Sequence, residues 1–215
     1  MNEFLLNDTP VKVWAKYVDP HAWKEIDNLS RLPFIYHHLA FMPDVHGGMG
    51  MPIGGVLASK KVVVPNAVGV DIGCGMCAVK TNLKADEISK DTIRKKIMSG
   101  IRARIPLGMD HHKDLQDEEF MPQGHDIDKL QVVSRQYVSA RRKLGTLGGG
   151  NHFIELQKDD DGFLWIMLHS GSRNLGKQVG DYYNKLAKEL NAMYHTAVDP
   201  AWQMHFLPLG SKEFT

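Results

Sequence analysis

Three glycine-flanked segments carry side chains that could bind a metal ion. Asp71 and Cys74 lie in the first segment, Asn151 and His152 in the second, and His169 in the third. Carboxylate, thiolate and imidazole donors together suit Mn²⁺, Zn²⁺, Fe²⁺ or Co²⁺ better than Mg²⁺ or Ca²⁺. Glycines beside such donors let the backbone approach an ion or a phosphate closely. The pattern therefore predicts a metal site that handles a nucleotide.

Two further features favour phosphate binding and acid–base chemistry. The run Gly148-Gly-Gly-Asn-His152 can present consecutive backbone N–H groups to an anion, and Ser170-Gly-Ser-Arg173 adds hydroxyls and a guanidinium before an expected helix. Asp44 follows an apolar run and could orient an imidazole, as carboxylates do in many catalytic sites.

Each of these residues also has a purely structural interpretation, which the sequence leaves open. Asp71 could cap a turn beside a buried Cys74, and Asp44 could form an Asx-turn. The two histidines, at strand ends, could be hydrogen-bonded structural residues. What favours a site is the recurrence of ligand types at four strand–loop junctions, because strand ends can converge at one edge of a sheet.

The chain has two cysteines, Cys74 and Cys77, which excludes a disulfide scaffold. We expect Cys74, in a turn between glycines, to be a functional thiol, and Cys77, in an emerging strand, to be a small core residue. The N-terminus lacks the features of a signal peptide, and no apolar run reaches ~18 residues, the length of a membrane span. A reduced cytoplasmic compartment fits a thiolate ligand.

Apolar runs predict the elements that position these residues. We expect strands at 11–14, 39–42, 55–58, 62–64 continuing to 68–70, 77–80, 153–156 and 163–168, the last two forming a hairpin. Helices are expected at 21–31, 85–98, 126–143 and 175–194. The segments 43–50 and 105–125 are expected to be loops, the second a surface loop or lid. With 215 residues, 43% hydrophobic, the chain can bury one sizeable core.

The charges nearly cancel, at +1 overall, but they are unevenly distributed. Residues 92–109 carry five lysines and arginines with no acid, and so do residues 129–154. Such stretches could follow a phosphate backbone, or they could be solvated helix surfaces.

Taken together, five segments resemble motifs of the RtcB-type RNA ligases, both in their amino-acid sequence and in their order along the chain. They are Met42-Pro-Asp-Val-His-Gly47, Pro52-Ile-Gly-Gly55, Val68-Gly-Val-Asp-Ile-Gly-Cys-Gly75, Leu147-Gly-Gly-Gly-Asn-His-Phe-Ile-Glu155 and His169-Ser-Gly-Ser-Arg173. The resemblance covers essentially the whole chain, residues 1–215, and corresponds to the N-terminal part of the family's catalytic domain. It implies an α/β (α+β) protein with a mixed β-sheet core and flanking helices, incomplete at its C-terminus.

The resemblance also implies an activity and a site. RtcB-type enzymes join an RNA 3′-phosphate or 2′,3′-cyclic phosphate to a 5′-hydroxyl in tRNA splicing and RNA repair, using GTP and two Mn²⁺ ions, some with an accessory activator protein. Carried over to this chain, the metal ligands would be Asp71, Cys74, His152 and His169, with Cys74 bridging both ions. Asn151 and Arg173 would contact nucleotide phosphates. Asp44 would orient the histidine that becomes guanylylated.

That guanylylated histidine lies, in the family, beyond the residue that matches Thr215. None of the eleven histidines occurs in the matching motif. We therefore expect this chain to be a fragment of a ligase, with an apolar surface exposed near residues 201–215. Two other functions remain open: a metal-dependent phosphoesterase that activates water, and a non-catalytic metal- or RNA-binding module.

Overall fold

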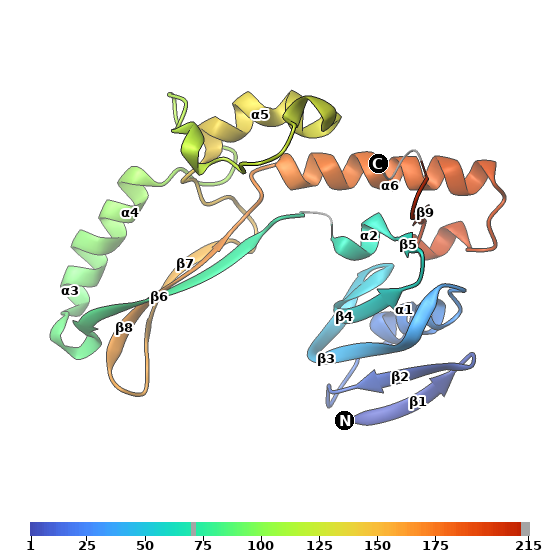
Figure 1. Cartoon of the computed structure of the whole chain (residues 1–215). Helices are drawn as coiled ribbons and strands as arrows, with labels where there is room; N and C mark the ends of the chain where they lie inside the picture. The colour runs from blue at the N-terminus through green and yellow to red at the C-terminus, as the bar shows by residue number, and fades with distance from the viewer. Residues whose placement is uncertain (70–71, 212–215) are drawn as a thin grey trace. The chain divides into compact units, whose positions relative to one another are not determined.

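The computed structural model describes residues 1–69 and 72–211, which include two compact units. One unit contains residues 1–70 and 180–215, and the other contains residues 71–179. The long helix α6 (Leu175–Met193) begins in the second unit and lies mostly in the first (Figure 1). Helices and strands are both well represented, so the predicted α+β class is confirmed.

The first unit is built on a four-stranded sheet. The sequence predicts its mixed character and three of its strands, but not the strand at residues 2–6. Its strands are β1 (Asn2–Leu6), β2 (Thr9–Val13), β3 (Ile35–Met49) and β4 (Met51–Ser59), in that spatial order. Strands β2 and β3 are parallel, whereas β1–β2 and β3–β4 are antiparallel. A parallel pair needs a crossover, and helix α1 (Pro20–Ser30) supplies it.

Helix α1 begins where the sequence says it should. Asp19 accepts a hydrogen bond from the Ala22 backbone N–H at 3.0 Å, and Pro20 occupies the first helical position. That hydrogen bond is the main reason why the pKa of Asp19 is lowered. The buried face of the helix, which includes Ile26 and Leu29, packs into the core of this unit.

The C-terminal segment completes the same core, contrary to our expectation of an exposed apolar surface near 201–215. After the turns α2 (Pro65–Val68) and η5 (Pro200–Trp202), strand β9 (Leu207–Pro208) pairs with β5 (Val62–Val63). Met204 is fully buried and Leu207 is 2% exposed. The apolar residues of 202–207 thus pack into the core of the first unit. Residues 212–215 lie outside the described part of the chain.

The second unit contains a three-stranded antiparallel sheet with the order β6 (Gly75–Lys84), β8 (Phe163–Ser170), β7 (Phe153–Lys158) (Figure 1). The predicted β7–β8 hairpin is confirmed. Asp159 closes its turn by accepting hydrogen bonds from the Phe163 backbone and from the Trp165 indole, and Lys80 pairs with it at 2.9 Å. These three donors hold the pKa of Asp159 far below its usual range.

The helices of the second unit differ in detail from the prediction. The expected helix at 85–98 is a 3₁₀ turn, η1 (Ala85–Glu87), followed by a continuous helical run through α3 (Lys90–Thr92), the π-helical turn η2 (Ile93–Ile97) and α4 (Met98–Arg104). Ser89 caps that run by accepting from the Thr92 N–H. A 3₁₀ turn, η4 (Ile127–Lys129), precedes α5 (Gln131–Lys143). Segment 105–125 contains one 3₁₀ turn, η3 (Glu118–Phe120).

Three local predictions are wrong. Residues 43–49 continue strand β3 through register shifts instead of forming a loop, because the side chains of Asp19 and Glu25 accept hydrogen bonds from backbone N–H groups there. Residues 65–68 form helix α2 rather than a strand, and Val70 lies outside the described residues. Cys77 is exposed rather than buried, because the β6 strand is open along most of its length. Among the helices that the structure describes, none has both the length and the apolar character to span a membrane.

Candidate metal centre

The topology of the second sheet brings three of the predicted ligands to one end. Because β6 and β7 are both antiparallel to the central strand β8, both begin where β8 ends. His169, near the end of β8, is in register with Met76 of β6 and Phe153 of β7. Cys74 directly precedes β6 and His152 directly precedes β7. The antiparallel arrangement therefore brings together residues 78 positions apart in the sequence.

The three side chains form one cluster. The ligand atoms of Cys74, His152 and His169 all lie within 4.8 Å of one another. The Cys74 Sγ atom is 3.4 Å from His152 Nε2. The two imidazole rings meet edge to face, with centroids 5.1 Å apart and an interplanar angle of 89°.

These distances suit a shared ion. Metal bonds of ~2.3 Å to sulfur and ~2.0 Å to nitrogen, at a tetrahedral angle, place the two donors about 3.5 Å apart. The Sγ–Nε2 distance of 3.4 Å agrees with that value. One thiolate and two imidazoles form a donor set for Zn²⁺, Co²⁺, Fe²⁺ or Mn²⁺, with thiolate favouring the softer ions. The fit supports a metal centre in this unit.

Two glycines make room for the His152 ring. A Cβ atom added to Gly171 would overlap the Cε1 atom of the ring and would lie 2.9 Å from both ring nitrogens. A Cβ atom added to Gly148, whose φ is +107°, would overlap His152 Nδ1 and lie 2.6 Å from the Nη1 atom of Arg173. The glycines therefore act sterically, by letting two backbone segments close around the imidazole.

Arg173 ties the loops beside the cluster to one another. Its Nε donates to Thr146 Oγ1 at 2.6 Å and its Nη2 donates to the Gly108 carbonyl at 2.8 Å. Thr146 is 6% exposed and donates its own hydroxyl to the Lys143 carbonyl. Burial, and secondarily the charge of Arg173, lowers the pKa of Lys143. Arg173 thus has a structural role besides the phosphate contact predicted for it.

Two other predicted site residues, Asn151 and Asp44, lie in the part of the chain that the structure describes, and both are exposed. Asp71 lies outside the described residues, so its role as a ligand stays a prediction. Asn151 is exposed and directly precedes His152. Asp44 is exposed on strand β3 of the first unit. The arrangement of Asp44 relative to the metal cluster therefore also stays a prediction.

Two carboxylates, one in α1 and one at its N-cap, fix the segment that follows Asp44. Glu25, 5% exposed, accepts hydrogen bonds from the N–H groups of Gly48 at 2.8 Å and Gly50 at 2.7 Å. Asp19 accepts one from the Gly47 N–H at 3.0 Å. Gly54, with φ +76°, leaves room for the Asp44 carboxylate, because a Cβ atom there would lie 2.7 Å from Oδ1.

Sequence reasoning missed Glu25, Thr146 and Gly171 as supports of the site. A buried glutamate on an amphipathic helix resembles a surface residue in sequence, so Glu25 offers no signal. Thr146 and Gly171 lie inside the glycine-flanked segments that the sequence does single out. Their closeness in sequence to His152 and Arg173 hints at a supporting role, but only the structure shows which contacts they make.

Comparison with known proteins identifies the family to which the chain is similar. A family model described as tRNA-splicing ligase RtcB matches residues 25–215. The RNA-splicing ligase RtcB of Escherichia coli K12 is 36% identical over 233 residues, which cover 100% of this chain and 56% of the relative. The tRNA-splicing ligase RtcB of Thermococcus kodakarensis is 32% identical over 213 residues, covering 78% of this chain and 44% of the relative. The chain thus spans about half the length of these curated relatives.

Proposed function

Because the chain belongs to the tRNA-splicing ligase RtcB family, we propose that it supplies the metal-binding part of a GTP- and Mn²⁺-dependent RNA ligase. The reaction joins an RNA 3′-phosphate or 2′,3′-cyclic phosphate end to a 5′-hydroxyl end. The observation that carries the proposal is the convergence of Cys74, His152 and His169 at one end of the second sheet.

The proposed centre holds two Mn²⁺ ions. Cys74, His152 and His169 would hold the ions together with Asp71, and a thiolate is the donor in this set that could be shared between two ions. Divalent ions at such a site neutralise charge that develops on phosphate oxygens. The ligand side chains hold the ions, and the residues packed around them keep the ligands in one rotamer and orient the phosphate.

Three further residues have proposed roles in nucleotide handling. Asn151 contacts the nucleotide phosphates from the loop that carries His152. Arg173, whose guanidinium lies beside Gly148, contacts a phosphate. Asp44 orients the histidine nucleophile that its family carries beyond the segment matched here, and Glu25 holds the backbone that follows Asp44.

The proposed partners are RNA with the two types of end described above and, where the ligase needs one, an accessory activator protein. The proposed biological roles are tRNA splicing and RNA repair. The proposed location is the cytoplasm, where an exposed thiol such as Cys74 stays reduced.

A chimera tests the function directly. Residues 1–215 replace the matching 56% of the E. coli relative, and the chimera is incubated with labelled RNA ends, GTP and Mn²⁺. We expect a joined product that requires both GTP and Mn²⁺. Cys74→Ala should abolish joining, whereas Cys77→Ala, which changes the other exposed thiol, should retain it.

The two rival functions predict different products from the unfused chain. A phosphoesterase opens the 2′,3′-cyclic phosphate or releases phosphate with metal alone, without GTP. A binding module retains RNA and yields no product in the chimera either. A folded, metal-loaded chimera that hydrolyses ends and joins none would contradict the ligase proposal.

A further inference from the structure

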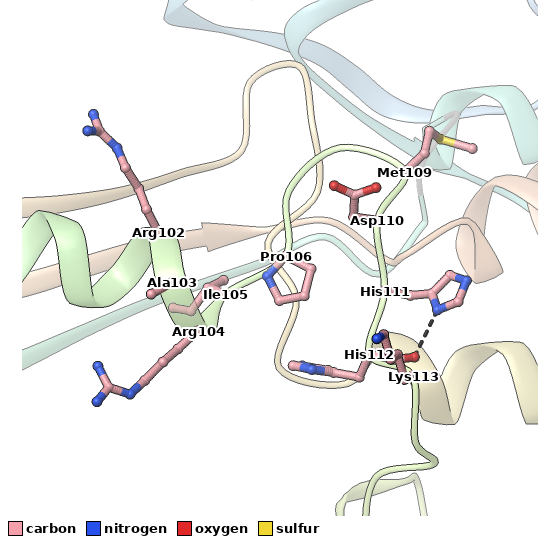
Figure 2. A pocket seen from close by; sticks show the side chains of 10 residues that line it. All are labelled: Arg102, Ala103, Arg104, Ile105, Pro106, Met109, Asp110, His111, His112 and Lys113. Carbon is pink, nitrogen blue, oxygen red and sulfur yellow. Dashed lines mark hydrogen bonds between the residues drawn. The ribbon is translucent and has the colours of Figure 1, made fainter.

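A cleft of about 580 Å³ opens beside the C-terminal end of helix α4 (Figure 2). The helix contributes Arg102 to Arg104 to its wall, and the following segment contributes residues up to Lys113. Its lining includes the cations Arg102, Arg104 and Lys113, the imidazoles of His111 and His112, and a single carboxylate, Asp110. The cleft is distinct from the cluster of Cys74, His152 and His169.

Positive charge exceeds negative charge in this cleft, since Arg102, Arg104 and Lys113 line it together with one carboxylate, Asp110. Arg102, Arg104 and Lys113 are exposed, and none forms an ion pair with another described residue. Other cations of this unit do form ion pairs: Lys95 pairs with Asp91 at 2.9 Å, and Arg141 pairs with Glu118 at 3.2 Å. An anionic ligand would therefore meet three available cations.

The cations are spread out rather than focused on one point. Arg102 and Arg104 are two residues apart on a helix, a spacing that directs side chains to different faces. Figure 2 shows their guanidinium groups pointing away from each other on either side of the chain. A single phosphate could not contact both arginines in this arrangement, whereas successive phosphates of an extended strand could.

The cleft also contacts the second basic stretch of the sequence, at the end of α5. The His112 N–H donates to the Arg142 carbonyl at 3.0 Å, which ties the cleft to the end of helix α5. The His112 Nε2 atom lies 3.7 Å from the position of a Cβ atom on Gly145. Arg142 and Lys143, in the last turn of α5, thereby extend the basic surface beyond the cleft.

Backbone hydrogen bonds connect this surface to the metal cluster. The Gly108 N–H donates to the Gly148 carbonyl at 2.9 Å, and the Leu147 N–H donates to the Pro106 carbonyl at 3.1 Å. Gly148 lies four residues before His152 and packs against its ring, so that an added Cβ atom there would overlap Nδ1. The segment that follows α4 and the loop that carries His152 are therefore joined by backbone hydrogen bonds.

We propose that the cleft binds the sugar-phosphate backbone of a single RNA strand whose end lies at the metal centre. Arg102, Arg104 and Lys113 contact successive phosphates, and the exposed His111 ring offers a stacking surface for a base. The inference rests on the proposed function in its choice of RNA as the polyanion. It adds a binding site, remote from the reacting ends, to that function.

The test measures binding of a fluorescent single-stranded RNA with a 3′-phosphate to the 215-residue chain as salt is varied. The variant Arg102→Gln/Arg104→Gln/Lys113→Gln removes the three cations. The matched control Lys16→Gln/Lys24→Gln/Lys60→Gln removes the same charge from exposed lysines of the first unit. Thermal unfolding and Co²⁺ uptake verify that both variants keep the fold and the metal site.

Three phosphate contacts on a single strand correspond to a change of about 2 in the slope of log K against log salt. The cleft variant should thus bind roughly 100-fold more weakly at 0.1 M salt but only about fourfold more weakly at 0.5 M. The control should bind with the slope of the unmodified chain. An unchanged slope in the cleft variant would overturn the proposal, as would poly-glutamate binding as tightly as RNA, which would indicate an acidic protein partner.

Failure of this inference and failure of the proposed function give different results. If the cleft variant binds RNA normally while the chimera ligates, the ligase proposal stands and the strand follows another surface. If the cleft variant loses RNA binding while the chimera never ligates, the cleft is an RNA site of a protein that is not a ligase.

Discussion

The substitution Gly171→Ala should disable the metal centre although it replaces none of the proposed metal ligands. The new Cβ atom would overlap the Cε1 atom of His152 and would lie 2.9 Å from both ring nitrogens, where ordinary contact begins at 3.4 Å. The ring must therefore move by at least about 0.5 Å, and metal sites tolerate deviations of only about 0.2 Å in ligand distances. The His152 ligand should be lost or strained.

The expected loss of metal affinity can be judged from other changes beside metal ligands. Changes that merely disturb the orientation of a ligand lower metal affinity by roughly 10- to 100-fold, which corresponds to about 1.4–2.7 kcal/mol. We expect Gly171→Ala to reach at least this range. Competition with a chromophoric chelator, using Co²⁺ or Mn²⁺, measures the dissociation constant of each variant.

The chain offers a matched control for this experiment. Gly149→Ala adds the same methyl group to a neighbouring glycine-rich loop, at a position where Cβ would lie 3.4 Å from the Gly108 Cα atom and φ is not in the left-handed region. It should bind metal almost normally. Equal metal affinity in the Gly171→Ala, Gly149→Ala and unmodified chains would refute the assignment of His152 as a ligand packed against Gly171.

Two further predictions concern the first unit. Burial, together with the nearby charge of Lys188, lowers the pKa of His205 in the folded state below the ~6.5 of the unfolded chain, so protons favour unfolding. The free energy of unfolding should therefore fall as pH decreases below about 6.5, and His205→Gln should remove part of that dependence in urea titrations, whereas the exposed His195→Gln should not. Glu25→Ala should lower the free energy of unfolding by about 2 kcal/mol, because it leaves two partly buried N–H groups without their acceptor, while Glu25→Gln should cost less. Equal urea midpoints for the two Glu25 variants would contradict this role.

The sequence predicts local elements well where one pattern determines them. The apolar runs on either side of Asp159 to Gly162 specify a hairpin, and the helix expected at 21–31 agrees with α1 to within one residue at each end. The recurrence of ligand types at strand ends also identifies three residues that do converge. In each case the decisive contacts are close in sequence or follow from strand order.

The failures have a common physical cause, which is tertiary contact. Residues 43–49 look like a loop because of their proline and glycines, but Asp19 and Glu25 accept hydrogen bonds from the backbone there. Cys77 looks buried because its strand is apolar, yet burial depends on what covers the sheet. The apolar segment around Met204 looks unpartnered, and it is the rest of the first unit that buries it.

The most direct test of the metal centre is optical titration of the chain with Co²⁺. Coordination by a thiolate and two imidazoles predicts a sulfur-to-metal charge-transfer band in the unmodified chain. The band should persist in Cys77→Ser and disappear in Cys74→Ser, although both thiols are exposed. A charge-transfer band that survives in Cys74→Ser, or that is absent from the unmodified chain at saturating Co²⁺, would contradict the proposed centre.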